Sequence, residues 1–134
     1  MEIQKGKTRW AAYNIAYHFV WIPKYRRKVL TSEVESEMRK LTLDVCQKYE
    51  VTVLALEIQP DHIHLFVSAP PRISPARIVG LVKGYTSRYL REKFLKLTKL
   101  CGKDQLWSKS YYVGTAGNVS AETIIRYIEE CQIS

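Results

Sequence analysis

The 134-residue sequence predicts an α+β fold, in which a four-stranded antiparallel sheet carries helices on one face. Segments rich in β-branched and aromatic residues alternate with segments whose apolar residues recur at helical spacing, in the order β-α-β-β-α-β-α. The composition is that of an ordinary globular domain, with 46% hydrophobic and 25% charged residues and no apolar run long enough to cross a bilayer. We therefore expect a single domain over residues 1–134.

The first predicted strand, AAYNIAYHFVWIP, runs from Ala11 to Pro23 and is rich in aromatic and β-branched residues. An exposed basic turn, KYRRK, follows it. The next segment, TSEVESEMRKLTLDVCQKYE, has Ser32 three residues before Glu35, which is the signature of a capping box. This segment is predicted to be a helix, because its apolar residues recur at helical spacing: Val34, Met38, Leu41, Val45 and Tyr49.

A hairpin and a long helix come next. We expect strands at residues 51–59 and 62–69, joined by the tight turn Pro60–Asp61. Ser74 is a suitable N-cap for a helix from Pro75 to Leu97, because proline is tolerated at the first helical position. The stripe of this helix expected to be buried contains Ile78, Leu81, Val82, Tyr85 and Tyr89.

The chain is predicted to end with the strand SYYVGTA and with a last helix in GNVSAETIIRYIEECQIS, capped by Ser120. A β-α-β-β-α-β order folds into a four-stranded antiparallel sheet with its two helices on one face, the ferredoxin-like (RRM-like) plan. The last helix is an addition to this plan.

The charge balance favours a polyanionic partner. There are 21 Lys and Arg against 13 Asp and Glu, which gives a net charge of +8 and a pI near 9.5. Nucleic acid is the first candidate, and some of the nine tyrosines and three tryptophans could stack on unpaired bases. The alternative is a solvated basic surface without a partner. The candidate DNA-binding residues are Lys24, Arg26, Arg27 and Lys28 in the basic turn and Lys83, Arg88 and Arg91 in the long helix.

The cysteines and the start of the chain favour the cytoplasm. Cys46, Cys101 and Cys131 are widely spaced and include no CxxC pair, which argues against both a disulfide framework and a thiolate zinc site. The opening segment, MEIQKGKTRW, has no apolar signal core after its charges. We expect a cytoplasmic protein with no membrane partner.

Two of the three histidines stand one residue apart in QPDHIHLFVSAPP. His62 and His64 point to the same side of a strand, so they are either packed or surface imidazoles or half of a metal site. A two-residue turn would place Gln59 opposite His62 and Glu57 opposite His64, on the same face. His18, in the first strand, is either a packed side chain or a third ligand.

Tyr127 shares one face of the last predicted helix with Ile124, Ile128 and Cys131. A tyrosine on an apolar helical face is usually part of the core. A catalytic role would require its hydroxyl to lie beside a phosphate polarised by a metal ion.

Five segments of the chain resemble one family. They are YHFVWIPKYRRKVL, EIQPDHIHLFVSAPP, SPARIVGLVKGYTSRYLREKF, LWSKSYYVGTAG and NVSAETIIRYIE, and they cover nearly the whole chain in order. Together they resemble the single-tyrosine HUH transposases of small insertion sequences, which move DNA as single strands. His-Ile-His matches the HUH signature, and Tyr127 matches the position of the family's nucleophile.

The resemblance implies an enzyme that cleaves and rejoins single-stranded DNA at element ends. It implies that His62 and His64 bind a divalent cation, Mg²⁺ or Mn²⁺, and that Tyr127 forms a 5′-phosphotyrosine intermediate. It also implies a homodimer that recognises DNA hairpins.

The sequence departs from the family pattern at the third metal ligand. The family commonly has a glutamine four residues after the tyrosine, where this chain has Cys131, and Gln132 follows one residue later. A five-residue step turns about 100° further round a helix than a four-residue step. The third ligand is therefore open between Gln132, Glu57, Gln59 and water.

Two rival functions share much of the same sequence pattern. One is a non-catalytic, ferredoxin-like module that binds single-stranded nucleic acid. The other is a domesticated HUH nickase, which cuts DNA without moving an element.

Overall fold

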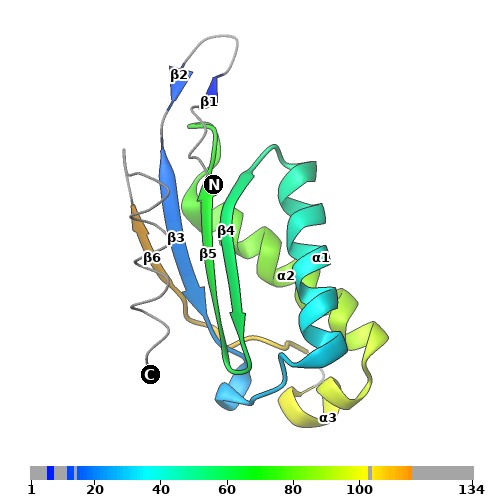
Figure 1. The fold of residues 1–134 in the computed structure, drawn as a ribbon. Helices are drawn as coiled ribbons and strands as arrows, with labels where there is room; N and C mark the ends of the chain where they lie inside the picture. The colour runs from blue at the N-terminus through cyan, green and yellow to red at the C-terminus, as the bar shows by residue number, and fades with distance from the viewer. Residues whose placement is uncertain (1–5, 8–11, 14, 103, 116–134) are drawn as a thin grey trace.

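A four-stranded antiparallel sheet forms the centre of the protein, and two helices cover one of its faces (Figure 1). The structure is a computed structural model that describes residues 6–7, 12–13, 15–102 and 104–115. The strands lie side by side in the order β4-β5-β3-β6 and are β3 (Ala16–Trp21), β4 (Thr52–Gln59), β5 (His62–Ser68) and β6 (Tyr112–Thr115).

The helices α1 (Ser32–Lys48) and α2 (Pro75–Lys93) complete the β-α-β-β-α-β order. Each follows a central strand of the sheet, α1 after β3 and α2 after β5. The predicted ferredoxin-like plan is therefore confirmed. The last predicted helix lies outside the described residues, and the single domain over residues 1–134 stays a prediction.

The first predicted strand is shorter than expected. The prediction of one strand from Ala11 to Pro23 is wrong, because β3 begins at Ala16, opposite the last residue of β5, Ser68. Ala12–Tyr13 instead forms β2, which pairs with β1 (Gly6–Lys7) in a separate two-stranded sheet.

The predicted capping box of α1 is also wrong. Thr31 is the N-cap, in an extended conformation, and no side chain caps the helix. Ser32 is the first helical residue, with a positive φ of 51°. The backbone carbonyl of Thr31 accepts the amide of Val34 at 3.0 Å, so the backbone alone closes the first turn.

The cap of α2 is confirmed, whereas its end is not. Ser74 accepts a hydrogen bond from the Arg77 amide at 3.1 Å, with Pro75 at the first position. The helix stops at Lys93 rather than Leu97, since Phe94 adopts φ −120° and ψ 89°. A short helix, α3 (Lys96–Cys101), follows.

The buried face of α2 is rotated from the predicted stripe. Tyr89 is exposed, and Leu81 and Tyr85 are only partly buried. The buried face includes three polar residues whose side chains hold the segment before β6. Thr86 accepts from the Trp107 indole at 3.0 Å and Ser87 accepts from the Leu106 amide at 2.9 Å, while Lys83 donates to the carbonyl of Ser108 at 2.8 Å.

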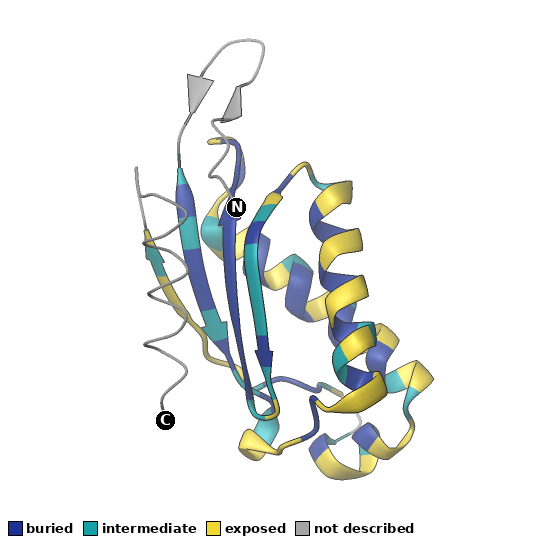
Figure 2. Ribbon diagram, viewed as in Figure 1, coloured by how far each residue is buried: buried dark blue, intermediate teal, exposed yellow. Residues whose placement is uncertain are grey.

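The two faces of the sheet have different roles. On one face Phe19, Ile63 and Leu65 pack against apolar side chains of α1 and α2. Because side chains alternate along a strand, His18, His62 and His64 belong to the other face. β5 is buried along its whole length (Figure 2), so both histidines that it carries are shielded from solvent.

Candidate active site

His62 and His64 stand at the start of β5, directly after the tight turn Pro60–Asp61. The register pairs Gln59 with His62 and Glu57 with His64, as predicted. The agreement follows from the turn, since its length determines which residues of a hairpin face each other.

Both histidines have their Nδ1 atoms engaged. His62 Nδ1 donates to Asp61 Oδ1 at 2.7 Å, and the other oxygen of Asp61 pairs with Arg26 Nε at 3.0 Å. His64 Nδ1 shares a hydrogen bond of 3.0 Å with His18 Nε2. Each ring is thus oriented through one nitrogen, in the manner of histidines that bind metal through the other.

Burial keeps the inner pair of histidines neutral. It lowers the pKa of His64 to about 4, with the charge of His62 adding to the effect, and it lowers the pKa of His18 to about 4, with the charge of His64 adding. At the turn, the hydrogen bond from His62 and the charge of Arg26 lower the pKa of Asp61. Asp61 is therefore an anionic acceptor, which requires the proton of His62 to sit on Nδ1.

The Nε2 atoms of His62 and His64 have no hydrogen-bond partner although both are buried. Only three buried side-chain polar atoms of the described residues are left without a partner. The third, Trp21 Nε1, lies on the face of the sheet that packs against α1 and α2. An unpaired buried nitrogen costs free energy and calls for an explanation. The two rings have centroids 5.2 Å apart, a separation compatible with one ion bound by both. Neutral imidazoles with free Nε2 lone pairs fit a divalent cation.

Glu57 does not complete this pair. Its Oε1 accepts a hydrogen bond from Gln59 Nε2 at 3.1 Å. Within the described residues no three His, Cys, Asp or Glu side chains are grouped to hold a metal ion. Two imidazoles and one carboxylate are therefore not gathered in this side-chain arrangement, because a correct register brings backbones together without directing the side chains. Glu57 as a third ligand stays a prediction.

The remaining predicted site residues of the last helix lie outside the described residues. These are the nucleophile Tyr127, the possible ligand Gln132 and Cys131.

The basic turn lies against the histidine hairpin. Lys24–Arg26 forms a short 3₁₀ helix, and the Leu30 amide donates to the Pro60 carbonyl at 3.0 Å. Arg27 and Lys28 are exposed, while Arg26 reaches Asp61. The turn therefore places the positive charge of Arg26 against Asp61, the residue directly before His62.

The basic residues of α2 are on the opposite side of the sheet and differ among themselves. Arg88 is exposed and pairs with Glu92 at 3.4 Å, and Arg91 Nε donates to the Ser87 carbonyl at 3.0 Å. Lys83 is buried with its ammonium against backbone carbonyls, which corrects its predicted place on a solvated basic face. Burial also lowers the pKa of Lys83.

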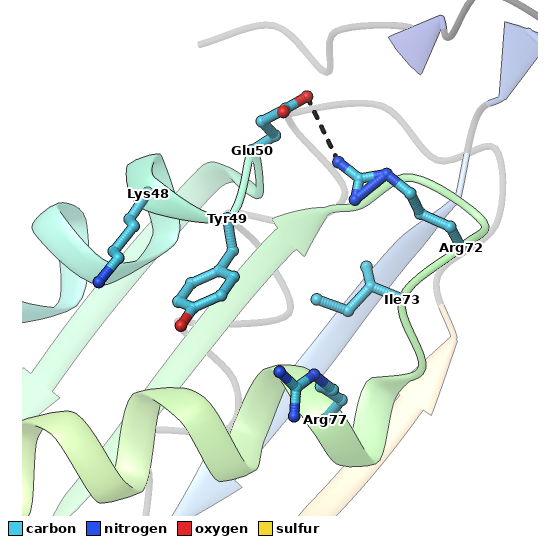
Figure 3. Close-up of a pocket in the computed structure, with 6 residues that line it drawn as sticks. All are labelled: Lys48, Tyr49, Glu50, Arg72, Ile73 and Arg77. Carbon is cyan, nitrogen blue, oxygen red and sulfur yellow. Dashed lines mark ion pairs between the residues drawn. The ribbon is translucent and has the colours of Figure 1, made fainter.

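A further basic pocket of about 300 Å³ lies where α1 ends and α2 begins (Figure 3). Arg72 pairs with Glu50 at 3.4 Å, so the other two cations of the pocket, Lys48 and Arg77, have no ion-pair partner among its lining residues. It is near the end of β5 away from His62. Sequence reasoning missed it, although two arginines in PPRISPAR were a visible signal. Its lining residues are Lys48, Tyr49, Glu50, Arg72, Ile73 and Arg77.

Asp61 is the other residue whose role sequence reasoning missed, since it was interpreted only as part of a turn. Its place directly before His62 was the available signal.

No helix within the described ranges is both long and apolar enough to span a membrane.

Comparison with known proteins identifies the family. Residues 11–131 match the family model of IS200-like transposases. The ISDra2 transposase TnpA of Deinococcus radiodurans is 31% identical over 129 residues, which cover 96% of this chain and 91% of that protein. The IS200 transposase of Salmonella typhimurium is 34% identical over 115 residues, covering 86% and 74% respectively.

Solved structures agree with the fold. A crystal structure from Deinococcus radiodurans R1, of a protein assigned as a transposase, superposes with a TM-score of 0.77 at 31% identity, covering 93% of this chain and 96% of that one. A REP-associated tyrosine transposase bound to a REP hairpin has a TM-score of 0.59 at 15% identity, covering 93% and 68%, and supports the fold alone. The match of residues 11–131 to a transposase family sets aside the alternative of a non-catalytic binding module. The chain belongs to the IS200-like family of transposases.

Proposed function

We propose that this transposase cleaves and rejoins single-stranded DNA with a divalent cation, Mg²⁺ or Mn²⁺, bound by His62 and His64 and with Tyr127 as its nucleophile. The observation that carries the proposal is the pair of buried Nε2 atoms without partners, each on a ring held through its Nδ1. Packed structural histidines would use both nitrogens or expose one of them to water.

The chemistry divides between the cation and the chain. A bound divalent cation polarises a phosphate oxygen and orients the phosphate. Tyr127 Oη then forms a bond to phosphorus while the bond from phosphorus to the 3′ oxygen breaks. The tyrosine loses its proton and the 3′ oxygen leaves as a hydroxyl, so one strand end carries a 5′-phosphotyrosine. Attack by another 3′-hydroxyl reverses these steps and joins strands without an external energy source.

The third ligand is proposed to be Gln132 or Glu57. Glu57 has the right register, and it would have to release Gln59 to reach the cation. Gln132 would have to reach it from the end of the predicted last helix, one residue beyond the family's usual position.

The basic turn is the proposed contact for the DNA backbone next to the site. Lys24, Arg27 and Lys28 stand beside the hairpin that carries the histidines, where phosphates flanking the cleaved bond would pass. Arg88 and Arg91 would contact DNA on the other side of the protein. A hairpin substrate at the element ends is supported by the solved REP-associated transposase, which holds one.

The proposal also includes a homodimer, and this part rests on the family resemblance. A domesticated nickase would share the same site and chemistry. The DNA on either side of the gene separates the two, since an active element has hairpin-forming ends.

Covalent capture tests the nucleophile. The chain is incubated with single-stranded hairpin DNA and Mg²⁺ or Mn²⁺ and then denatured. We expect a protein–DNA adduct from the wild type and from Tyr89→Phe, a matched control on the helical face, and none from Tyr127→Phe. An adduct that persists in Tyr127→Phe overturns the assignment, and the absence of an adduct from the wild type with either metal overturns the proposed chemistry.

A further inference from the structure

His18 makes the contact that most directly affects His64. Its Nε2 lies 3.0 Å from His64 Nδ1, and both side chains are buried, with 4% and 3% exposure. The planes of the two rings differ by only 12°. An N–H···N bond between imidazoles requires the lone pair of one ring to point at the N–H of the other within both ring planes, and nearly parallel planes allow this.

This bond couples the tautomers of the two rings. One proton lies between two nitrogens, so one ring donates and the other accepts. If His18 accepts, the proton of His64 is on Nδ1 and its Nε2 keeps a lone pair. If His18 donates, the proton of a neutral His64 is on Nε2, which then has no lone pair for a cation and no acceptor for its N–H. The missing partner at His64 Nε2 agrees with the first arrangement.

The ring of His18 is itself held in place. It stacks on Phe66 with centroids 4.2 Å apart and planes 4° apart, and it packs edge to face with Tyr112, with ring centroids 5.7 Å apart. The β3–β5 register puts His18 opposite Phe66, two residues along β5 from His64 and therefore on the same face of the sheet. Backbone pairing and stacking therefore fix the direction in which Nε2 of His18 points.

We propose that His18 is a positioning residue, which accepts the Nδ1 proton of His64 and thereby presents His64 Nε2 as a ready metal ligand. This inference rests on the proposed metal site and assigns His18 a role other than that of a ligand. The Nε2 of His18 is occupied by His64 Nδ1, on the other side of the His64 ring from the nitrogen that would hold the cation.

Two substitutions separate the hydrogen bond from packing. His18→Phe keeps an aromatic ring against Phe66 and removes the acceptor. His18→Gln places an amide oxygen near the position of Nε2 and keeps an acceptor. Titration calorimetry with Mn²⁺ should show a loss of about 10–100-fold in affinity for His18→Phe and a change of only a few fold for His18→Gln.

The tautomer of His64 is an independent readout on the metal-free wild type. Long-range ¹H–¹⁵N correlation spectra should show the proton of His64 on Nδ1, and in His18→Phe they should show it on Nε2. Thermal unfolding of the metal-free variants serves as the folding control.

The outcomes distinguish this inference from the proposed function. Mn²⁺ binding by the wild type and its loss in His64→Ala support the metal site. On that background, equal Mn²⁺ affinity for His18→Phe and the wild type overturns the role of His18, as does equal loss in His18→Phe and His18→Gln. A proton on Nε2 of His64 in the wild type overturns it directly. A wild type that binds no Mn²⁺ overturns the proposed metal site itself.

Discussion

His62 and His64 stand two residues apart on the same face of β5, yet different chemistry holds each ring. At the turn, Asp61 is shared between His62 and a half-exposed Arg26. One step further into the strand, His64 is held by the neutral, buried ring of His18. Both arrangements leave Nε2 without a partner. The comparison teaches that two ligand atoms of the same kind can be oriented differently, one by a charged partner at the edge of the site and the other by a neutral hydrogen bond inside it.

The largest expected effect comes from removing either ligand. His62→Ala and His64→Ala should each abolish stabilisation by Mn²⁺, because one imidazole is too few for a bound cation. Thermal unfolding with and without Mn²⁺ measures this, and a ligand at 100 times its dissociation constant stabilises by about 2.7 kcal/mol. The rise in unfolding temperature that Mn²⁺ causes in the wild type should reverse with a chelator. If Mn²⁺ raised the unfolding temperature of either variant as much as that of the wild type, that histidine would not be a ligand.

Removing the charged support should have the next largest effect. Asp61→Ala leaves His62 Nδ1 without its acceptor, so we expect Mn²⁺ affinity to fall by about tenfold. Asp61→Asn keeps an acceptor oxygen and should lose less. Asp44→Ala, an exposed carboxylate of α1, is the matched control. Calorimetry that shows Asp61→Ala binding as tightly as Asp44→Ala would mean that His62 needs no partner.

The hairpin part of this site could be predicted from the sequence because its cause is local. The two-residue turn at Pro60–Asp61 determines the register, and alternation along a strand sends His62 and His64 the same way. The contact between His18 and His64 could not be predicted in the same manner. It depends on the β3–β5 register, which joins residues 46 positions apart and is set by the packing of the whole sheet.

The face of α2 shows a second limit of local patterns. Apolar spacing predicted that Tyr89 is buried and that Lys83 is exposed to solvent. The structure reverses both, because buried Lys83, Thr86 and Ser87 bond to the segment that leads into β6. Hydrophobic periodicity cannot register a polar side chain whose partner lies about twenty residues further along the chain.

The smallest expected effect comes from Arg26, and its salt dependence is the finest test of the comparison. Arg26→Leu removes a cation whose side chain is 52% exposed, and exposed ion pairs contribute about 0.2–1 kcal/mol. We therefore expect Mn²⁺ affinity to fall by about fivefold or less at low ionic strength. At about 1 M salt, where charges are screened beyond about 3 Å, the ratio of wild-type to variant affinity should approach one.

The same ratio for His18→Phe should stay nearly constant with salt, since a buried neutral hydrogen bond is not screened. Arg72→Leu, which breaks an exposed ion pair with Glu50 near the other end of β5, is the matched control and should leave affinity unchanged at every salt concentration. If the Arg26→Leu ratio does not depend on salt, charge is not what holds His62, and the two histidines are supported in the same way.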